Sequence, residues 1–157
     1  MPKHLLALAG FLVAAFAAGA FGAQFTPGPW YEALNRPSWN PPNWIFGPVW
    51  TVLYILIATS AWLVWRQGKK QPEAPTATAL ATWTVQLVLN ALWSWIFFGL
   101  HQLAGAFAEV CLLWIAIALT IGLFGRVHKL AAWLLVPYLA WVSFAAFLNF
   151  TIWRLNP

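Results

Sequence analysis

Charged residues are scarce in this chain. They make up 7% of its 157 residues, while hydrophobic residues make up 62%. A soluble globular domain usually carries about 25% charged residues, so this chain cannot cover itself with a water-facing surface. Uncharged apolar runs longer than about 18 residues are typical of helices that cross a bilayer, where a helix satisfies its own backbone hydrogen bonds. The composition predicts an integral membrane protein.

Cysteine and acidic residues are also rare. Cys111 is the single cysteine, which excludes an intramolecular disulfide and a CxxC metal motif. His4, His101 and His128 lie near the ends of apolar runs, and we assign no metal to them. The apolar runs contain no carboxylate pair and no combination of Ser, His and acid, and the chain has no glycine-rich phosphate loop. We therefore expect neither hydrolytic chemistry, nor a metal, nor a required cofactor.

The net charge of +5 could suggest a nucleic-acid partner, but the positions of the basic residues argue against one. They lie between or beyond the apolar runs, where they act as topology determinants. Six fall on one side of five spans and two on the other. We therefore predict a cytoplasmic N-terminus, in the cell membrane of a bacterium, with the first loop and the C-terminus on the opposite side. The six are Lys3, Arg66, Lys69, Lys70, Arg126 and Lys129, and the two are Arg36 and Arg154.

The apolar runs predict an all-α fold, a compact bundle of five transmembrane helices that forms one domain over residues 1–157. Residues 24–43 carry five of the eleven prolines, which predicts a rigid, packed loop over the bundle, with a short helical piece at residues 30–35. The five helices are expected at about 5–23, 44–65, 78–98, 103–124 and 130–153.

The first apolar run also resembles a cleavable signal peptide, because Lys3 precedes it and small residues end it. We favour a retained helix, since small residues recur in it at every fourth position. Such a stripe lets membrane helices approach closely, and it predicts a homodimer or partner interface. One row is Gly10, Ala14, Ala18 and Gly22, and Ala15, Gly19 and Ala23 extend a second.

The chain has 13 tryptophans, many at span ends, where indole rings anchor membrane proteins at the interface. Trp50, Trp93, Trp114 and Trp141 lie deeper, so core packing and ligand stacking both remain open for them. Helical spacing places these residues in rows that share a face. The rows are Trp50 with Tyr54; Gln86, Asn90, Trp93 and Phe97; and Pro137, Trp141, Ala145 and Asn149.

Polar side chains inside the spans have two explanations. Gln86, Asn90 and Asn149 would either form hydrogen bonds between helices or line a ligand pocket together with the aromatic residues. Glu109 is the one acid within a span. An intramembrane ionisable residue is usually functional, although the nearby helix start would also stabilise this carboxylate.

Three segments together resemble the translocator protein family, also called TspO/MBR, the tryptophan-rich sensory proteins or the peripheral-type benzodiazepine receptors. These segments are "WYEALNRPSWNPPNWIFGPVWTVLY", "QLVLNALWSWIFFG" and "LLVPYLAWVSFAAFLNFTIWRLN". They cover most of the chain from Trp30 onward, and the Trp-x-Pro-Pro element that ends at Pro42, followed by Trp50, is the most specific part.

The resemblance implies a five-helix bundle, commonly dimeric, with a pocket near the first loop that accepts porphyrins, cholesterol-like lipids and benzodiazepine-type ligands. Membrane lipid would surround the bundle. Trp50 and Trp141 match the tryptophans proposed for light-dependent porphyrin degradation. The positions that match the pocket or its lid are Tyr31, Trp39, Trp50, Tyr54, Asn90, Trp93, Glu109, Trp141 and Ala145, and Pro41 and Pro42 would make the lid rigid.

The chain departs from the family pattern at a few positions. Tyr54 and Trp93 stand where relatives often have phenylalanine, and Glu109 where they often have aspartate, so the aromatic or acidic character is kept. In the last helix, Phe150 takes the tyrosine place of the motif associated with cholesterol. Such motifs are weak even when complete, so this remnant by itself does not predict cholesterol recognition.

The leading hypothesis is a membrane receptor or transporter-like protein that binds porphyrin, or another planar hydrophobic molecule, with a role in porphyrin regulation or stress sensing. In it, Trp50, Trp93 and Trp141 stack on the ring, Asn90 forms a hydrogen bond with it, and the first loop is a lid. A second hypothesis is a porphyrin-degrading photo-oxidoreductase that uses Trp50 and Trp141. A third makes the protein structural, with the small-residue stripe as its interface.

Overall fold

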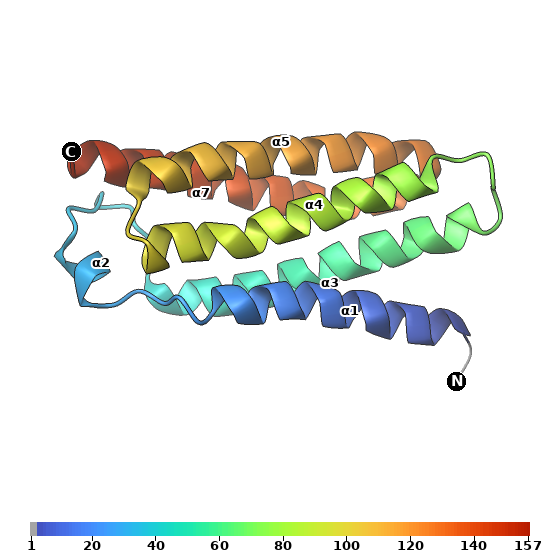
Figure 1. Ribbon diagram of the computed structural model, residues 1–157, viewed down its shortest axis with the longest axis horizontal. Coiled ribbons are helices and arrows are strands. Elements are labelled where there is room, and N and C mark those ends of the chain that lie inside the picture. Colours follow the sequence, from blue (N-terminus) through green and yellow to red (C-terminus); the bar gives the residue numbers. More distant parts are fainter. Residues whose placement is uncertain (1–2) are drawn as a thin grey trace.

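The computed structural model describes residues 3–157, so residues 1 and 2 of the predicted domain lie outside the described residues. The described chain is helical, and five of its segments are long and apolar enough to cross a membrane. The predicted fold class is confirmed. The elements in Figure 1 are α1 (Lys3–Gly22), α2 (Pro29–Ala33), α3 (Asn43–Gly68), α4 (Thr76–Ser94), η1 (Trp95–Gly99), α5 (Leu103–Val127), α6 (Lys129–Leu134) and α7 (Val136–Leu155).

Two of the five spans are not single α-helices. The third continues from α4 into η1, a turn of π-helix in which the Leu100 amide donates to the Trp95 carbonyl over 2.8 Å. The fifth is divided at Leu135 into α6 and α7, and α7 begins with Pro137 in its first turn. Proline has no amide hydrogen to donate, which costs little in the first turn of a helix. Its ring would clash with the preceding turn of a continuous helix, so the helix breaks before it.

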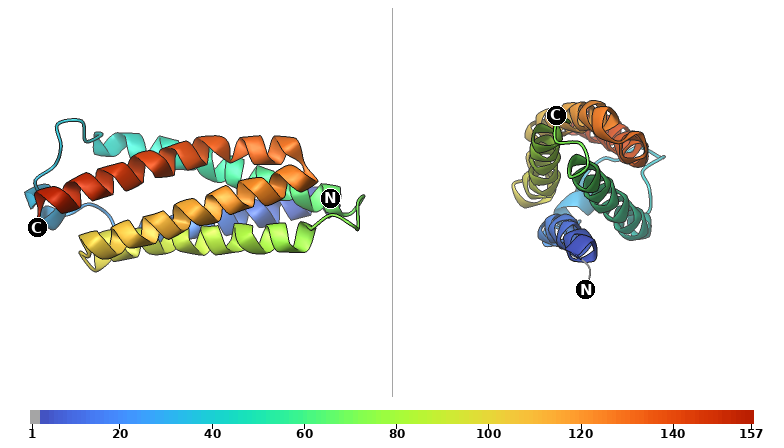
Figure 2. Two further views of the ribbon diagram at one scale, coloured as in Figure 1. Left: turned by 90° about the horizontal axis from the view of Figure 1, so that it is seen from above. Right: turned by 90° about the vertical axis from the view of Figure 1, so that its right-hand side faces the viewer.

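The five spans lie side by side along one axis, and Figure 2 looks down this axis in its right-hand view. Around the bundle, α1 packs against α3 and α4, α4 against α5, and α5 against α7. The ring of helices is closed by α3 and the fifth span. These two are in close contact along α6, whereas α3 hardly touches α7. The two helices therefore diverge toward the end that carries the first loop, which leaves room for a cavity there.

Helix α1 approaches the bundle through its small residues. Ala15 is fully buried, and a Cβ atom built on Gly19 would overlap the ring of Tyr54. Only glycine allows this distance between α1 and α3. Gly10, by contrast, has nothing within 4 Å of such an atom. Part of the predicted small-residue stripe thus packs inside one copy of the chain, and the homodimer stays a prediction.

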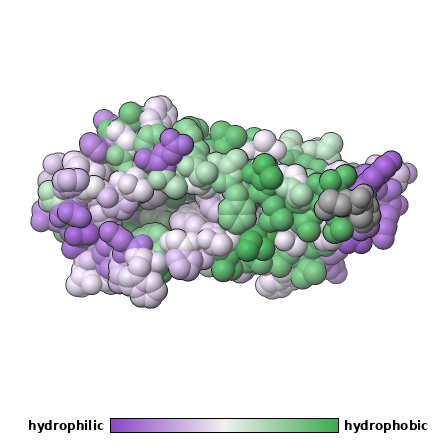
Figure 3. Space-filling model, turned by 90° about the horizontal axis from the view of Figure 1, so that it is seen from below, coloured by the Kyte–Doolittle hydropathy of each residue, from purple (hydrophilic) through white to green (hydrophobic). Residues whose placement is uncertain are grey.

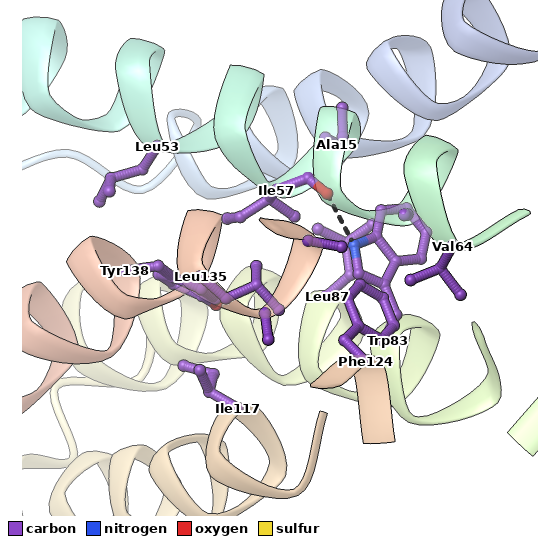
Figure 4. Packing of buried hydrophobic residues seen from close by; sticks show 14 of the residues in the cluster. Ala15, Leu53, Ile57, Val64, Trp83, Leu87, Ile117, Phe124, Leu135 and Tyr138 are labelled. Atoms are coloured by element: carbon purple, nitrogen blue, oxygen red, sulfur yellow. Dashed lines mark hydrogen bonds between the residues drawn. The ribbon is translucent and has the colours of Figure 1, made fainter. Parts of the chain in front are cut away.

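The main apolar core is shown in Figure 4. It joins α1, α3, α4, α5 and the fifth span. Within it, the Trp83 indole lies beside Phe124 and donates a 3.0 Å hydrogen bond to the Ile57 carbonyl. This carbonyl already belongs to a helix, so the bond fixes the rotation of α4 against α3.

The two ends of the bundle differ. The first loop and the C-terminus lie at one end in Figure 1, and the start of α1 and the α3–α4 connection lie at the other. At that second end, Arg66 lies over the Trp62 ring at 4.6 Å and Lys69 over the Trp65 ring at 3.8 Å. Such pairs suit the membrane interface. The chain is an integral membrane protein, and its orientation stays a prediction.

Candidate functional site

The first loop is packed against the end of the bundle. Its short helix α2 falls at Pro29–Ala33, close to the predicted helical piece at residues 30–35. Tyr31 of α2 is 4% exposed, and its ring lies 6.0 Å from that of Phe97 and 5.4 Å from that of Phe98. Its hydroxyl donates to Oδ1 of Asn40 over 3.0 Å, so both halves of the loop are held together.

Two further contacts attach the loop to the last helix. The backbone amide of Asn35 donates to Oδ1 of Asn156 over 3.0 Å, and Nδ2 of Asn156 donates back to the Asn35 carbonyl over 2.9 Å. Trp39 stacks on Phe147 of α7 with ring centres 5.3 Å apart. Another stack, between Trp30 and His101 at 4.1 Å, ties α2 to the α4–α5 connection. These contacts hold the loop, which we call the lid below, against the end of the bundle.

A cavity of about 570 Å³ lies beneath this lid, where α3 and α7 diverge. This volume is in the range of small-molecule sites. All five spans and the first loop contribute to its wall. Figure 3 shows the face of the bundle seen from below, which is hollowed near the end that carries the loop.

Aromatic rings form much of the cavity wall. Trp50 and Tyr54 of α3 stack with ring centres 5.4 Å apart, as the four-residue spacing predicts. Opposite them, Trp141 of α7 lies 5.9 Å from Phe46. Trp93 stacks on Phe97 at 5.0 Å, and the wider π-turn of η1 brings Phe97 and Phe98 to the cavity together. The flat faces of these rings suit a planar ligand.

A chain of hydrogen bonds runs from the cavity wall into the core. The Tyr54 hydroxyl donates to Oδ1 of Asn90 over 2.8 Å, and Nδ2 of Asn90 donates to the Tyr138 hydroxyl over 3.1 Å. The Tyr138 hydroxyl then donates to Oε1 of Gln86 over 2.8 Å. Tyr54 and Asn90 line the cavity, and the chain joins α3, α4 and α7 behind it.

The Asn90 amide keeps capacity for a ligand. A side-chain amide has two N–H donors and an oxygen with two lone pairs, and the chain of hydrogen bonds uses one N–H and one lone pair of Asn90. At the α7 side of the cavity, Oδ1 of Asn149 accepts from the Trp93 indole over 3.1 Å, and its Nδ2 donates to the Leu103 carbonyl over 3.0 Å. Asn149 thus fixes the orientation of Trp93.

Among residues 3–157, none of the side chains that line the cavity is charged. Its polar groups are hydroxyls, amides and indole N–H groups. Glu109, the acid predicted at the site, is 7% exposed on α5, but it is not part of the cavity wall, unlike its neighbours Val110 and Leu113. Neither carboxylate oxygen of Glu109 has a hydrogen-bond partner in the described part of the chain.

The structure brings seven of the predicted ligand-binding residues together around the cavity. They are Tyr31, Trp50, Tyr54, Asn90, Trp93, Trp141 and Ala145. Trp39 contacts α7 from the lid, and Pro41 and Pro42 line a shallow hollow on the outside of the loop. Trp114, the other deep tryptophan, is 39% exposed and donates to the Ser143 hydroxyl at the outer surface of the bundle. Ligand contact stays a prediction for all of them.

Tyr138 is not among the residues predicted from the sequence, although it is fully buried and connects Asn90 to Gln86. A helical period signals its place, because Tyr138, Val142, Ala145 and Asn149 are spaced by four, three and four residues on α7. The predicted row began one residue earlier, at Pro137, which is exposed. Tyr138 shares one face of α7 with Asn149, and this row of polar side chains along a membrane span is the signal that could have identified it.

Comparison with known proteins gives consistent matches over this whole fold. The model of the TspO/MBR family matches residues 9–154. Protein CrtK of Rhodobacter capsulatus is 46% identical, over 98% of this chain and 94% of its own length. The tryptophan-rich protein TspO of Chlorobaculum tepidum is 46% identical over the full length of both chains. The translocator protein of Homo sapiens is 39% identical, over 94% of this chain and 88% of its own.

Proposed function

The chain belongs to the TspO/MBR family, and on that premise we propose that it binds tetrapyrroles, such as protoporphyrin and other haem precursors, within the bundle. A membrane receptor or transporter-like role is supported by the family and by the translocator protein relatives. The proposal adds the class of ligand, its place in the cavity, and a role in porphyrin regulation or stress sensing. Sterol-like and benzodiazepine-type molecules are further ligands of the same cavity.

The observation that carries this proposal is an uncharged cavity with tryptophans on three of its helices, Trp50 on α3, Trp93 on α4 and Trp141 on α7. In the bound state, these indoles stack on the tetrapyrrole ring and the free N–H of Asn90 forms a hydrogen bond with it. The lid formed by the first loop excludes water. A large flat apolar ring gains from this wall both burial and stacking.

A titration of the purified protein with protoporphyrin, followed by tryptophan fluorescence, tests the proposal. Porphyrin bound beside the three indoles quenches their emission, and the quenching saturates. In a Trp50→Phe, Trp141→Phe double variant the aromatic wall persists, while the saturable quenching decreases. Quenching in the wild type that is no greater than in the double variant would remove the proposal. The Trp114→Phe variant, changed at the outer surface, serves as the matched control.

A second candidate function uses the same site for light-dependent porphyrin oxidation, and the position of both Trp50 and Trp141 in the cavity wall favours it. Dioxygen is the oxidant. One carbon–carbon bond of the ring breaks and two carbon–oxygen bonds form, so both oxygen atoms enter the product and no external reductant is consumed. A tryptophan lends an electron to the light-excited ring, dioxygen adds to the resulting radical anion, and the tryptophan regains its electron from this adduct before the ring opens. Unchanged product formation in both single phenylalanine variants would exclude this role.

A further inference from the structure

A polar hollow adjoins the cavity on the outside of the lid. It is lined by Asn35, Arg36, Asn40 and Asn43, together with prolines and Leu34. Arg36 is the only basic residue of residues 24–43, and Glu32 is the only acid. The hollow therefore combines one cation with several side-chain amides, which is a set of hydrogen-bond donors suited to an anionic oxygen.

Arg36 is connected to the cavity through Tyr31. The guanidinium carbon of Arg36 lies over the Tyr31 ring, 5.0 Å from its centre, and this contact holds an otherwise flexible side chain. Tyr31 is itself part of the cavity wall, and its hydroxyl is bonded to Asn40 of the hollow. Asn43 lines both the hollow and the cavity. A single layer of side chains thus separates the cation from the ligand space.

The cavity wall offers no cation to a ligand's carboxylate. This wall has no charged side chain within the described residues, and transfer of an unpaired charge into an apolar interior is strongly unfavourable. A tetrapyrrole with acidic substituents therefore gains from placing them beyond the cavity wall, where water and a cation are available. The hollow is a polar surface of the lid that shares Asn43 with the cavity wall.

From this geometry we infer that Arg36 binds a carboxylate of the ligand while the flat ring lies in the cavity below. The inference rests on the proposed function and adds to it a preference for planar acids over neutral planar molecules of the same shape. Arg36 then makes the protein prefer ligands with a carboxylate, while the aromatic wall of the cavity provides the affinity for the tetrapyrrole ring. A neutral ligand of the same shape gains nothing from Arg36.

Anionic oxygens at this place could also come from a lipid phosphate, because Arg36 lies in a loop at the end of the spans, next to the headgroup region. The two sources make different demands. If Arg36 binds the ligand carboxylate, the affinity for the ligand depends on Arg36 even without phospholipid. If Arg36 binds a lipid phosphate, only the interaction with anionic membranes depends on it. Measurements in a nonionic detergent without phospholipid therefore isolate the first.

The test compares protoporphyrin with its dimethyl ester, which has the same ring but no acidic group. Affinities for both are measured by fluorescence quenching in nonionic detergent, for the wild type, Arg36→Gln, Arg36→Lys and Arg154→Gln. Arg154→Gln is the matched control, because it removes a charge from the last turn of α7, at a residue outside the hollow and the cavity.

We expect Arg36→Gln to weaken binding of the diacid about three- to tenfold, the range for a partly solvated charge-assisted contact, and to leave the ester unchanged. Arg36→Lys retains part of the affinity, and Arg154→Gln retains all of it. Equal affinity of the Arg36→Gln variant and the wild type for the diacid would overturn the inference. So would an equal loss for diacid and ester, which indicates a disturbed lid, or a loss that appears only with anionic phospholipid.

The same measurements separate the inference from the proposed function. If the wild type binds neither porphyrin nor ester, the proposed function itself fails. If it binds both and the Arg36 variants do not discriminate between them, the cavity keeps its proposed ligand and only the role of Arg36 is lost.

Discussion

The Tyr54 hydroxyl donates a 2.8 Å hydrogen bond to Oδ1 of Asn90 and so joins α3 to α4 at the wall of the cavity. Asn90 in turn donates to Tyr138 of α7. Three helices are therefore connected by buried polar groups on the side of the cavity that faces the core. In a bilayer, where apolar packing alone distinguishes poorly between helix arrangements, such bonds fix which faces meet.

Loss of the Tyr138 hydroxyl tests this connection. Tyr138→Phe leaves Nδ2 of Asn90 and Oε1 of Gln86 without their shared partner, both in the buried core. We expect a destabilisation of about 1–2 kcal/mol, measured as a lower midpoint of thermal unfolding in detergent. Tyr31→Phe, which removes one hydroxyl from the loop end, is the control and should cost less. A Tyr138→Phe variant as stable as the wild type would show that the chain of hydrogen bonds contributes nothing.

Two glycines of α1 give a matched pair for helix packing. Gly19→Ala places a methyl group against the Tyr54 ring and should destabilise the protein by about 1–3 kcal/mol. Gly10→Ala meets no atom within 4 Å and removes a flexible residue from a helix, so it should be neutral or stabilising by up to about 1 kcal/mol. Thermal unfolding of both variants checks the prediction. The opposite order of stability would refute the close approach of α1 to α3.

The lid should loosen when its bond to the C-terminus is removed. Asn156→Ala deletes both hydrogen bonds to the Asn35 backbone. We expect faster hydrogen–deuterium exchange across residues 29–42 and faster ligand dissociation, while the spans themselves exchange as before. Thr151→Val is the control, because its hydroxyl bonds only to the Phe147 carbonyl of its own helix. Exchange that is equal in the Asn156→Ala variant and the wild type would mean that the Asn156 bonds do not help to hold the lid.

Much of this architecture can be predicted from the sequence because bilayer thickness and helical periodicity are strong constraints. They predict the five spans and the rows that bring Trp50, Tyr54, Asn90 and Trp93 to one interior. The family resemblance, in contrast, supplies the expected ligand. Periodicity alone leaves an aromatic cavity without a stated purpose.

Other features could not be predicted, since they depend on how the helices rotate and break. The π-turn at Trp95–Gly99 inserts an extra residue into a helical turn, and apolar composition gives no sign of it. Glu109 lies next to Val110 in sequence, but adjacent residues on a helix point about 100° apart, so only Val110 reaches the cavity. An acid within a span predicts that the side chain is buried, but it does not predict whether the side chain faces the cavity.

The proposed function places a tetrapyrrole in the cavity between α3 and α7. The most direct measurement is the affinity for protoporphyrin of an Ala145→Trp variant, compared with Ala140→Trp on the same helix. Ala145 lines the cavity, whereas Ala140 is exposed on the outside of α7. We predict that the indole at position 145 fills the ligand space and abolishes saturable binding, while the one at position 140 leaves it intact. Wild-type affinity in the Ala145→Trp variant would contradict the claim.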